Sequence, residues 1–91
     1  MLKITIVYEN PDQLQKFRND SFPQNPIVEC LDMNTLAGRK AGFKIKRAYG
    51  ARKNPFCLVE DGNPLKVFYS ENDYEDDAIT QLIRYLHGES I

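Results

Sequence analysis

The chain has 91 residues, of which 42% are hydrophobic and 27% are charged, and its formal net charge is −1. This length supports one domain with a single sheet and a few helices, which buries about 60–65% of the unfolded surface. The near-neutral charge disfavours nonspecific nucleic-acid binding, and no apolar run approaches the roughly 18 residues of a membrane-spanning helix. The first residues, MLKITIVYENP, lack the pattern of a signal peptide, so we expect a cytoplasmic protein with reduced thiols.

The first third of the chain predicts a strand, a short helix and a second strand. Residues 2–8 alternate in polarity and are rich in β-branched side chains, as in a strand that is buried on at least one face. Asn10, Pro11 and Gln13 match the capping box at the start of a helix, which two prolines then end. Residues 27–32 have the pattern of another strand. A strand, helix and strand of these lengths favour parallel pairing.

The middle of the chain predicts a loop followed by a helix. Apolar residues recur at helical spacing over residues 41–48, but Gly38 and Gly42 disfavour a helix in the first half of this region. We therefore expect the helix over residues 42–49, with Gly50 as its C-cap.

The last third predicts a hairpin and a third helix. Residues 56–60 and 65–69 have strand patterns, and the short Asp-Gly turn between them requires antiparallel pairing. Asn72 and Glu75 match a second capping box, and an amphipathic helix rich in acids at its start follows and ends at Gly88. The predicted fold is a single α/β domain of order β-α-β-α-β-β-α, with a four-stranded mixed sheet and three helices.

This order and the stretch over residues 49–68 resemble the thioredoxin superfamily. Thioredoxins commonly show Tyr-Gly-x-Arg-x-x-Pro before a strand, a turn with glycine and a second strand. The residues that match this pattern are Tyr49, Gly50, Arg52 and Pro55. The resemblance implies a thioredoxin-like fold for residues 1–91 and a cis peptide bond at Asn54–Pro55, in a loop that faces the family's active centre.

The chain departs from the redox-active members of this family at the start of the first helix. Those proteins carry Cys-x-x-Cys there, where the helix N-terminus lowers the pKa of the first thiol. When Tyr8 and Pro11 are aligned with the glutaredoxin pattern, the two cysteine positions fall on Gln13 and Lys16. Residues 70–73, which include two acids, replace the glutaredoxin glycine pair and disfavour a glutathione carboxylate. We therefore expect no dithiol chemistry and no cofactor.

The two cysteines of the chain, Cys30 and Cys57, do not replace that motif. Each lies in an apolar run, where a thiol usually behaves as a small hydrophobic side chain. In the thioredoxin strand order they stand about 9–10 Å apart, beyond the roughly 7 Å Cα separation of a disulfide. With a lone histidine, His87, they are too scattered for a zinc site. Cys57, two residues after Pro55, stays open as a single redox-active thiol.

Charge is segregated along the chain. No acid lies between Asp32 and Glu60, a region that contains seven basic residues within residues 39–53, which we call the basic segment. Its members are Arg39, Lys40, Lys44, Lys46, Arg47, Arg52 and Lys53. Lys44 and Arg47 share a helix face with an aromatic residue nearby, a pattern that can bind a protein or a phosphate backbone. The acids that follow include Asp73, Glu75, Asp76 and Asp77, which lack the spacing of a calcium loop, so we expect no metal.

The sequence predicts a redox-inactive, thioredoxin-like and glutaredoxin-like module that binds a protein partner, with no enzymatic activity expected. The residues expected to bind are Pro11, Gln13, Lys44, Arg47, Arg52, Lys53, Asn54 and Pro55. Compact versions of this fold without the cysteine motif resemble accessory proteins of phages and mobile elements. Two alternatives stay open: a single-cysteine thiol oxidoreductase or redox sensor that uses Cys57, and a nucleic-acid binder that uses the basic segment.

Overall fold

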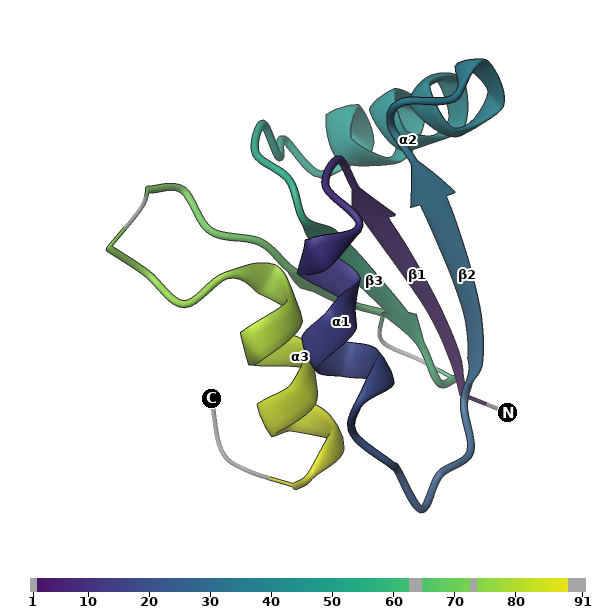
Figure 1. The fold of residues 1–91 in the computed structure, drawn as a ribbon, viewed down its shortest axis with the longest axis vertical. Coiled ribbons are helices and arrows are strands. Elements are labelled where there is room, and N and C mark those ends of the chain that lie inside the picture. Colours follow the sequence, from purple (N-terminus) through teal and green to yellow (C-terminus); the bar gives the residue numbers. More distant parts are fainter. Residues whose placement is uncertain (1, 63–64, 73, 89–91) are drawn as a thin grey trace.

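The four strands form one mixed sheet of order β2-β1-β3-β4, and Figure 1 labels β2, β1 and β3 in this sheet. The computed structural model describes residues 2–62, 65–72 and 74–88. The strands are β1 (Lys3–Tyr8), β2 (Ile27–Asp32), β3 (Phe56–Glu60) and β4 (Lys66–Phe68). β1 pairs with β2 in parallel, and the other pairs are antiparallel. The predicted element order, pairing directions and α/β class are confirmed, and they are consistent with a thioredoxin-like topology. Two residues of the predicted hairpin turn, 63 and 64, lie outside the described residues.

Helices cover both faces of the sheet. α1 (Asp12–Arg18) and α3 (Ala78–Leu86) lie side by side on one face, and α2 (Leu36–Ala48) packs on the other, across the ends of β1 and β2 (Figure 1). Strand side chains alternate between these two layers, as the pleat of a strand requires. In β3, Cys57 and Val59 face α1 and α3, whereas Phe56 and Leu58 face α2.

The start of α1 has one of the two bonds of the predicted capping box, from the Asn10 amide to the Gln13 side chain, whereas the Asn10 side chain bonds the Asp12 amide instead of the Gln13 amide. The helix begins at Asp12, but Pro11 already has helical dihedral angles, with φ −54° and ψ −29°. The Asn10 side chain accepts a hydrogen bond from the Asp12 amide at 3.0 Å, and the Gln13 side chain accepts one from the Asn10 amide at 3.2 Å. These two bonds satisfy amides that the helix itself leaves without partners.

The prediction for the start of α2 was wrong: the helix begins at Leu36 instead of residue 42. The Thr35 side chain caps it by accepting a hydrogen bond from the Gly38 amide at 3.0 Å. The glycines that disfavoured a helix are required by close packing. An added Cβ at Gly38 would lie 2.1 Å from the Asp32 carbonyl oxygen. One at Gly42 would lie 2.5 Å from the Met33 sulfur and 2.9 Å from a methyl group of Val7.

α2 ends at Ala48 with Tyr49 as its C-cap, one residue earlier than predicted, and Gly50 follows directly. Gly50 has a positive φ of 72°, a conformation that suits glycine. The amides of Gly50 and Ala51 donate to the carbonyl oxygens of Arg47 and Lys46, at 3.2 and 2.9 Å. This is the Schellman pattern of helix termination, and it turns the chain towards Pro55.

The predicted capping box of α3 was placed too early. Asp77 caps the helix by accepting a hydrogen bond from the Thr80 amide at 2.7 Å. Asn72 and Glu75 bond to each other at 3.3 Å in the preceding turn, so the acids precede the helix instead of forming its first turn. The predicted end is confirmed, because Gly88 has a φ of 81° directly after the last turn.

Within the described ranges, no helix is both long enough and apolar enough to cross a membrane. The cytoplasmic location stays a prediction.

Candidate functional site

The loop at Asn54–Pro55 lies at the end of the sheet where β1 ends and α1 begins. Its peptide bond is cis, as the resemblance implied. The next residue, Phe56, pairs with Val7 of β1, which places the loop beside the last residue of that strand. Pro55 is buried and Asn54 is half-buried. The structure therefore brings the predicted proline loop and the predicted start of α1 to the same end of the sheet.

Gln13 and Lys16, which align with the two cysteines of the glutaredoxin pattern, both make hydrogen bonds that stabilise the structure. The Gln13 side chain accepts hydrogen bonds from the amides of Glu9 and Asn10, each at 3.2 Å. The Lys16 ammonium donates to the Thr80 hydroxyl at 2.8 Å and so links α1 to α3. Both side chains hold the first helix in place.

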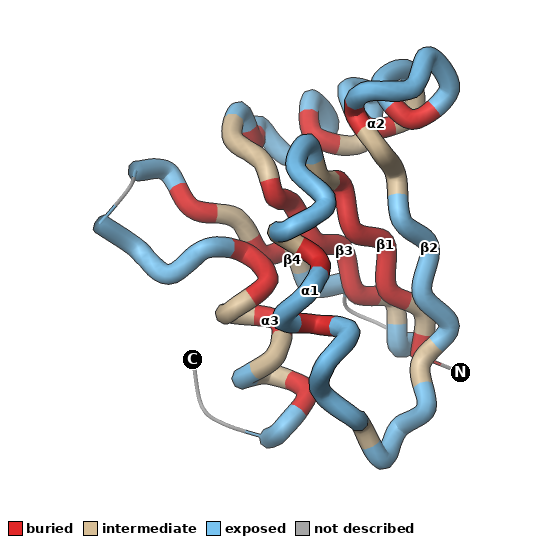
Figure 2. Tube along the Cα trace, in the orientation of Figure 1, coloured by how far each residue is buried: buried red, intermediate tan, exposed pale blue. Residues whose placement is uncertain are grey.

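The two cysteines lie on opposite sides of Ile6 and have opposite environments. Ile6 is in register with Cys30 of β2 on one side and with Cys57 of β3 on the other, and both thiols are free. Cys57 is fully buried, and burial, with a smaller effect of the Asp77 charge, raises the pKa of its thiol. Cys30 is exposed, so the expectation that it is a buried hydrophobic residue was wrong. The reason is that β2 is an edge strand, which Figure 2 shows as mostly exposed.

A buried lysine, which the sequence analysis did not single out, connects α2 to the proline loop. Lys46 has only 4% of its surface exposed, and its ammonium donates a hydrogen bond to the Asn54 side chain at 2.7 Å. The ring of Phe43 lies 5.8 Å from the same nitrogen. Burial lowers the pKa of Lys46, and the negative charge of Glu9 opposes this shift. The only sequence signal was its spacing, one helical turn after the buried Gly42.

Three shallow hollows adjoin along the second half of α2 and the turn after it. The outer hollow, of about 450 Å³, shares Phe43 and Arg47 with the middle hollow, of about 420 Å³. The middle hollow shares Gly50 and Arg52 with the third, of about 360 Å³, which reaches the segment directly after β4. We call this continuous surface the basic track. The basic residues that line it are Lys40, Lys44, Lys46, Arg47, Arg52 and Lys53.

Four of the predicted binding residues lie on the basic track, namely Lys44, Arg47, Arg52 and Lys53. Asn54 is connected to the track through Lys46, whereas Pro11 and Gln13 do not line it. The described residues form ion pairs between Arg84 and Asp76 and between His87 and Asp20. In that same part of the chain, no ion pair involves Lys40, Lys44, Lys46, Arg47 or Arg52. Glu71 is the one acid among the described lining residues.

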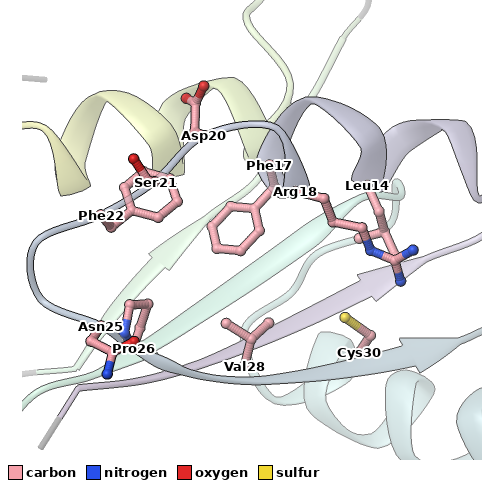
Figure 3. Close-up of a pocket in the computed structure, with 10 residues that line it drawn as sticks. All are labelled: Leu14, Phe17, Arg18, Asp20, Ser21, Phe22, Asn25, Pro26, Val28 and Cys30. Carbon is pink, nitrogen blue, oxygen red and sulfur yellow. The ribbon is translucent and has the colours of Figure 1, made fainter.

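A separate groove of about 470 Å³ lies between α1 and the edge strand β2 (Figure 3). Its walls combine polar and apolar side chains: Phe17 and Phe22 stack with ring centroids 5.0 Å apart, and Val28 lies opposite on β2. The sulfur of Cys30 points from β2 towards α1 (Figure 3). The sequence carries no signal for this groove, because it depends on how α1 and the segment after it pack over β2.

The acids considered as a metal site have other partners. The Asp76 carboxylate pairs with Arg84, and Asp77 caps α3. Asp73 lies outside the described residues. Across residues 2–62, 65–72 and 74–88, no three histidine, cysteine or acidic side chains gather as a metal site would require.

Comparison with known proteins finds no match for this chain among protein-family models, curated proteins or solved structures.

Proposed function

We propose that this protein is a redox-inactive, thioredoxin-like module that binds a protein partner along the basic track and the adjoining Asn54–Pro55 loop. The observation that carries the proposal is the charge of the basic track, where six basic residues line one continuous surface. Phe43, with 55% of its surface exposed, supplies an aromatic contact in the middle of these charges. Arginine and aromatic side chains are enriched at protein interfaces, and complementary charge steers partners together.

The hydrogen bonds at the start of α1 support the redox-inactive part of the proposal. Thiol–disulfide exchange needs an accessible thiolate, which helix N-termini favour. Gln13 and Lys16 occupy the two positions where such thiols would lie, and neither can form a disulfide. Cys57 is near the proline loop in sequence, but its burial keeps the thiol protonated and away from substrates.

Site-specific photo-crosslinking tests the binding part. A photoreactive phenylalanine analogue placed at position 43, in the protein expressed in its native cell, should form a discrete protein adduct. The same analogue at Gln15, an exposed position on α1, should not form this adduct. Charge reversal at Lys44 and Arg47 should abolish it. If position 43 gives no protein adduct, or only adducts that nuclease removes, the proposal is wrong.

Insulin reduction tests the redox part. The reduced protein should not accelerate the reduction of insulin disulfides above the rate without protein. Turnover that is lost in Cys57→Ser would instead support the oxidoreductase alternative. Turnover that is lost in Cys30→Ser would assign the activity to the exposed thiol of β2.

Nucleic-acid binding is the second candidate function, and the exposed Phe43 ring among Lys40, Lys44 and Arg47 favours it. Aromatic rings stack on bases while lysine and arginine contact phosphates, and such binding weakens steeply with salt. Salt-dependent binding of an oligothymidylate that is lost on charge reversal at Lys44 and Arg47 would support this candidate. A role as an accessory protein of a phage or mobile element stays a prediction.

A further inference from the structure

The ammonium group of Lys46 is buried without a carboxylate partner. Buried charges are costly unless another charge or several hydrogen bonds compensate them. Glu9 is close enough to favour the charged form of Lys46, yet the described residues contain no ion pair between the two. Lys46 therefore lacks the partner that a buried lysine usually has.

The Lys46 ammonium makes one hydrogen bond to the described part of the protein. An ammonium group has three donors, and one of them is directed to the Asn54 side chain oxygen at 2.7 Å. No other acceptor for this nitrogen lies among the described residues. The ring of Phe43 contributes a weaker electrostatic contact at 5.8 Å. Two of its three donors are thus not directed to an acceptor among the described residues.

Lys46 lines the middle hollow of the basic track together with Arg47 and Arg52, whose side chains are exposed. An anion in this hollow would meet three positive groups, and guanidinium groups bind carboxylates through paired hydrogen bonds. We propose that the middle hollow receives an aspartate or glutamate side chain of the partner, with the Lys46 ammonium as its innermost contact. This inference rests on the proposed function, because the carboxylate belongs to the bound protein.

The recessed position of Lys46 favours a protein carboxylate over a nucleic-acid phosphate. A glutamate carboxylate is carried away from the backbone by a flexible side chain and can reach a recessed cation. A phosphodiester is part of its backbone, so flanking sugars would have to enter the hollow with it. Phe43 and Ala51 add apolar surface to the same hollow, which suits an acidic segment that also contains aromatic or aliphatic residues.

Fluorescence anisotropy with a defined probe tests the inference. The probe is a labelled synthetic peptide of alternating glutamate and phenylalanine, and its control is the peptide with glutamine in place of glutamate. Wild-type protein should bind the glutamate peptide at least about tenfold more tightly than the glutamine peptide. Lys46→Met should remove most of this difference. Lys3→Gln also removes one positive charge, at the opposite end of β1 from Tyr8, and should change the affinity less than about twofold.

The possible outcomes separate this inference from the proposed function. Equal affinity of wild-type protein for the two peptides, or no saturable binding of either, overturns the carboxylate site whatever the variants do. If Lys46→Met does not fold by circular dichroism, Arg52→Gln in the same hollow replaces it, and unchanged discrimination there overturns the inference. A protein adduct at position 43 would still support the proposed function in each of these cases. Tighter binding of an oligothymidylate than of the glutamate peptide would overturn the inference in favour of a phosphate ligand.

Discussion

The two faces of the sheet share the same strands but differ in what they bury. Among the described residues, the hydrophobic cluster under α1 and α3 contains twelve buried side chains. The hydrophobic cluster under α2 contains five buried side chains, and α2 also buries the charged Lys46. The outer side of α2 carries the basic track, whereas α1 and α3 are joined to each other by the hydrogen bond from Lys16 to Thr80.

This difference indicates that the two faces of the sheet have different roles, one in stability and the other in binding. Hydrophobic stabilisation grows with buried apolar area, so the α1 and α3 face supplies more of the folding free energy. The α2 face has a smaller apolar core, and its helix presents a charged surface with an exposed aromatic ring. Changes on the first face should therefore reduce stability, and changes on the outer side of α2 should reduce binding.

The largest expected effect is the difference in reactivity between the two thiols. It tests how well α1 and α3 exclude solvent from the face of the sheet that they cover. At neutral pH, Cys30 should be alkylated at least about a thousandfold faster than Cys57, which reacts only when the core opens. Mass spectrometry of a time course with iodoacetamide measures both rates. Cys30→Ser should leave no fast thiol, and rapid modification of Cys57 in that variant would contradict the buried assignment.

Removal of a large side chain from each core compares the two faces directly. Leu82 is fully buried under α3, so Leu82→Ala should lower the free energy of unfolding by about 3 kcal/mol. Ile45 of α2 is only half-buried, so Ile45→Ala should cost about 1–2 kcal/mol. Urea denaturation measures both values, and Leu36→Ala, at a highly exposed position, is the control. A larger loss at Ile45 than at Leu82 would reverse the comparison.

The close contact between α2 and β2 should be sensitive to a single methyl group. Gly38→Ala places a Cβ against the Asp32 carbonyl oxygen, which is backbone and cannot move aside easily. The clash should lower the free energy of unfolding by about 2 kcal/mol, more than the roughly 1 kcal/mol that alanine adds to helix stability. Lys40→Ala, an exposed change in the same helix, is the control in thermal and urea unfolding. Stabilisation by Gly38→Ala would mean that the helix lies farther from β2.

The smallest expected effect is a pH dependence that arises from Lys46. Burial lowers its pKa in the folded state, so between that pKa and the ordinary value of about 10.4 the unfolded chain binds more protons. The free-energy cost of burying the charged Lys46 ammonium therefore applies in full at neutral pH, and it decreases as the pH rises through this window. The stability of the wild-type protein relative to Lys46→Met should increase from neutral pH towards about pH 10. Parallel urea midpoints for the two proteins would contradict the lowered pKa.

Local patterns in the sequence were enough to predict the element order and most boundaries. Residues 27–32 and 56–60 were predicted as strands with their observed limits, because β-branched and aromatic runs there are bounded by prolines and turn residues. Gly50 and Gly88 were predicted correctly as helix ends, because a positive φ after a helix suits glycine. The cis bond at Pro55 followed from the family resemblance.

Three features could not be predicted, since each depends on residues distant in sequence. Helix propensity disfavoured the first half of α2, but Gly38 is needed where this helix meets the end of β2. Cys30 has a hydrophobic sequence environment, and only the strand order placed it on an exposed edge. Lys46 is one of seven basic residues in the basic segment. Only the tertiary structure shows that it is buried and bonded to Asn54.

The sequence by itself thus determined the order of helices and strands and the segregation of charge, because these follow from local periodicity, turn residues and short connections, whereas the order of strands in the sheet followed from the family resemblance. The tertiary structure alone decided which thiol is accessible, which glycines allow helix and strand to approach, and which lysine lies buried at the proline loop. Burial is a property of packed elements, and the two sides of each contact come from separate parts of the chain.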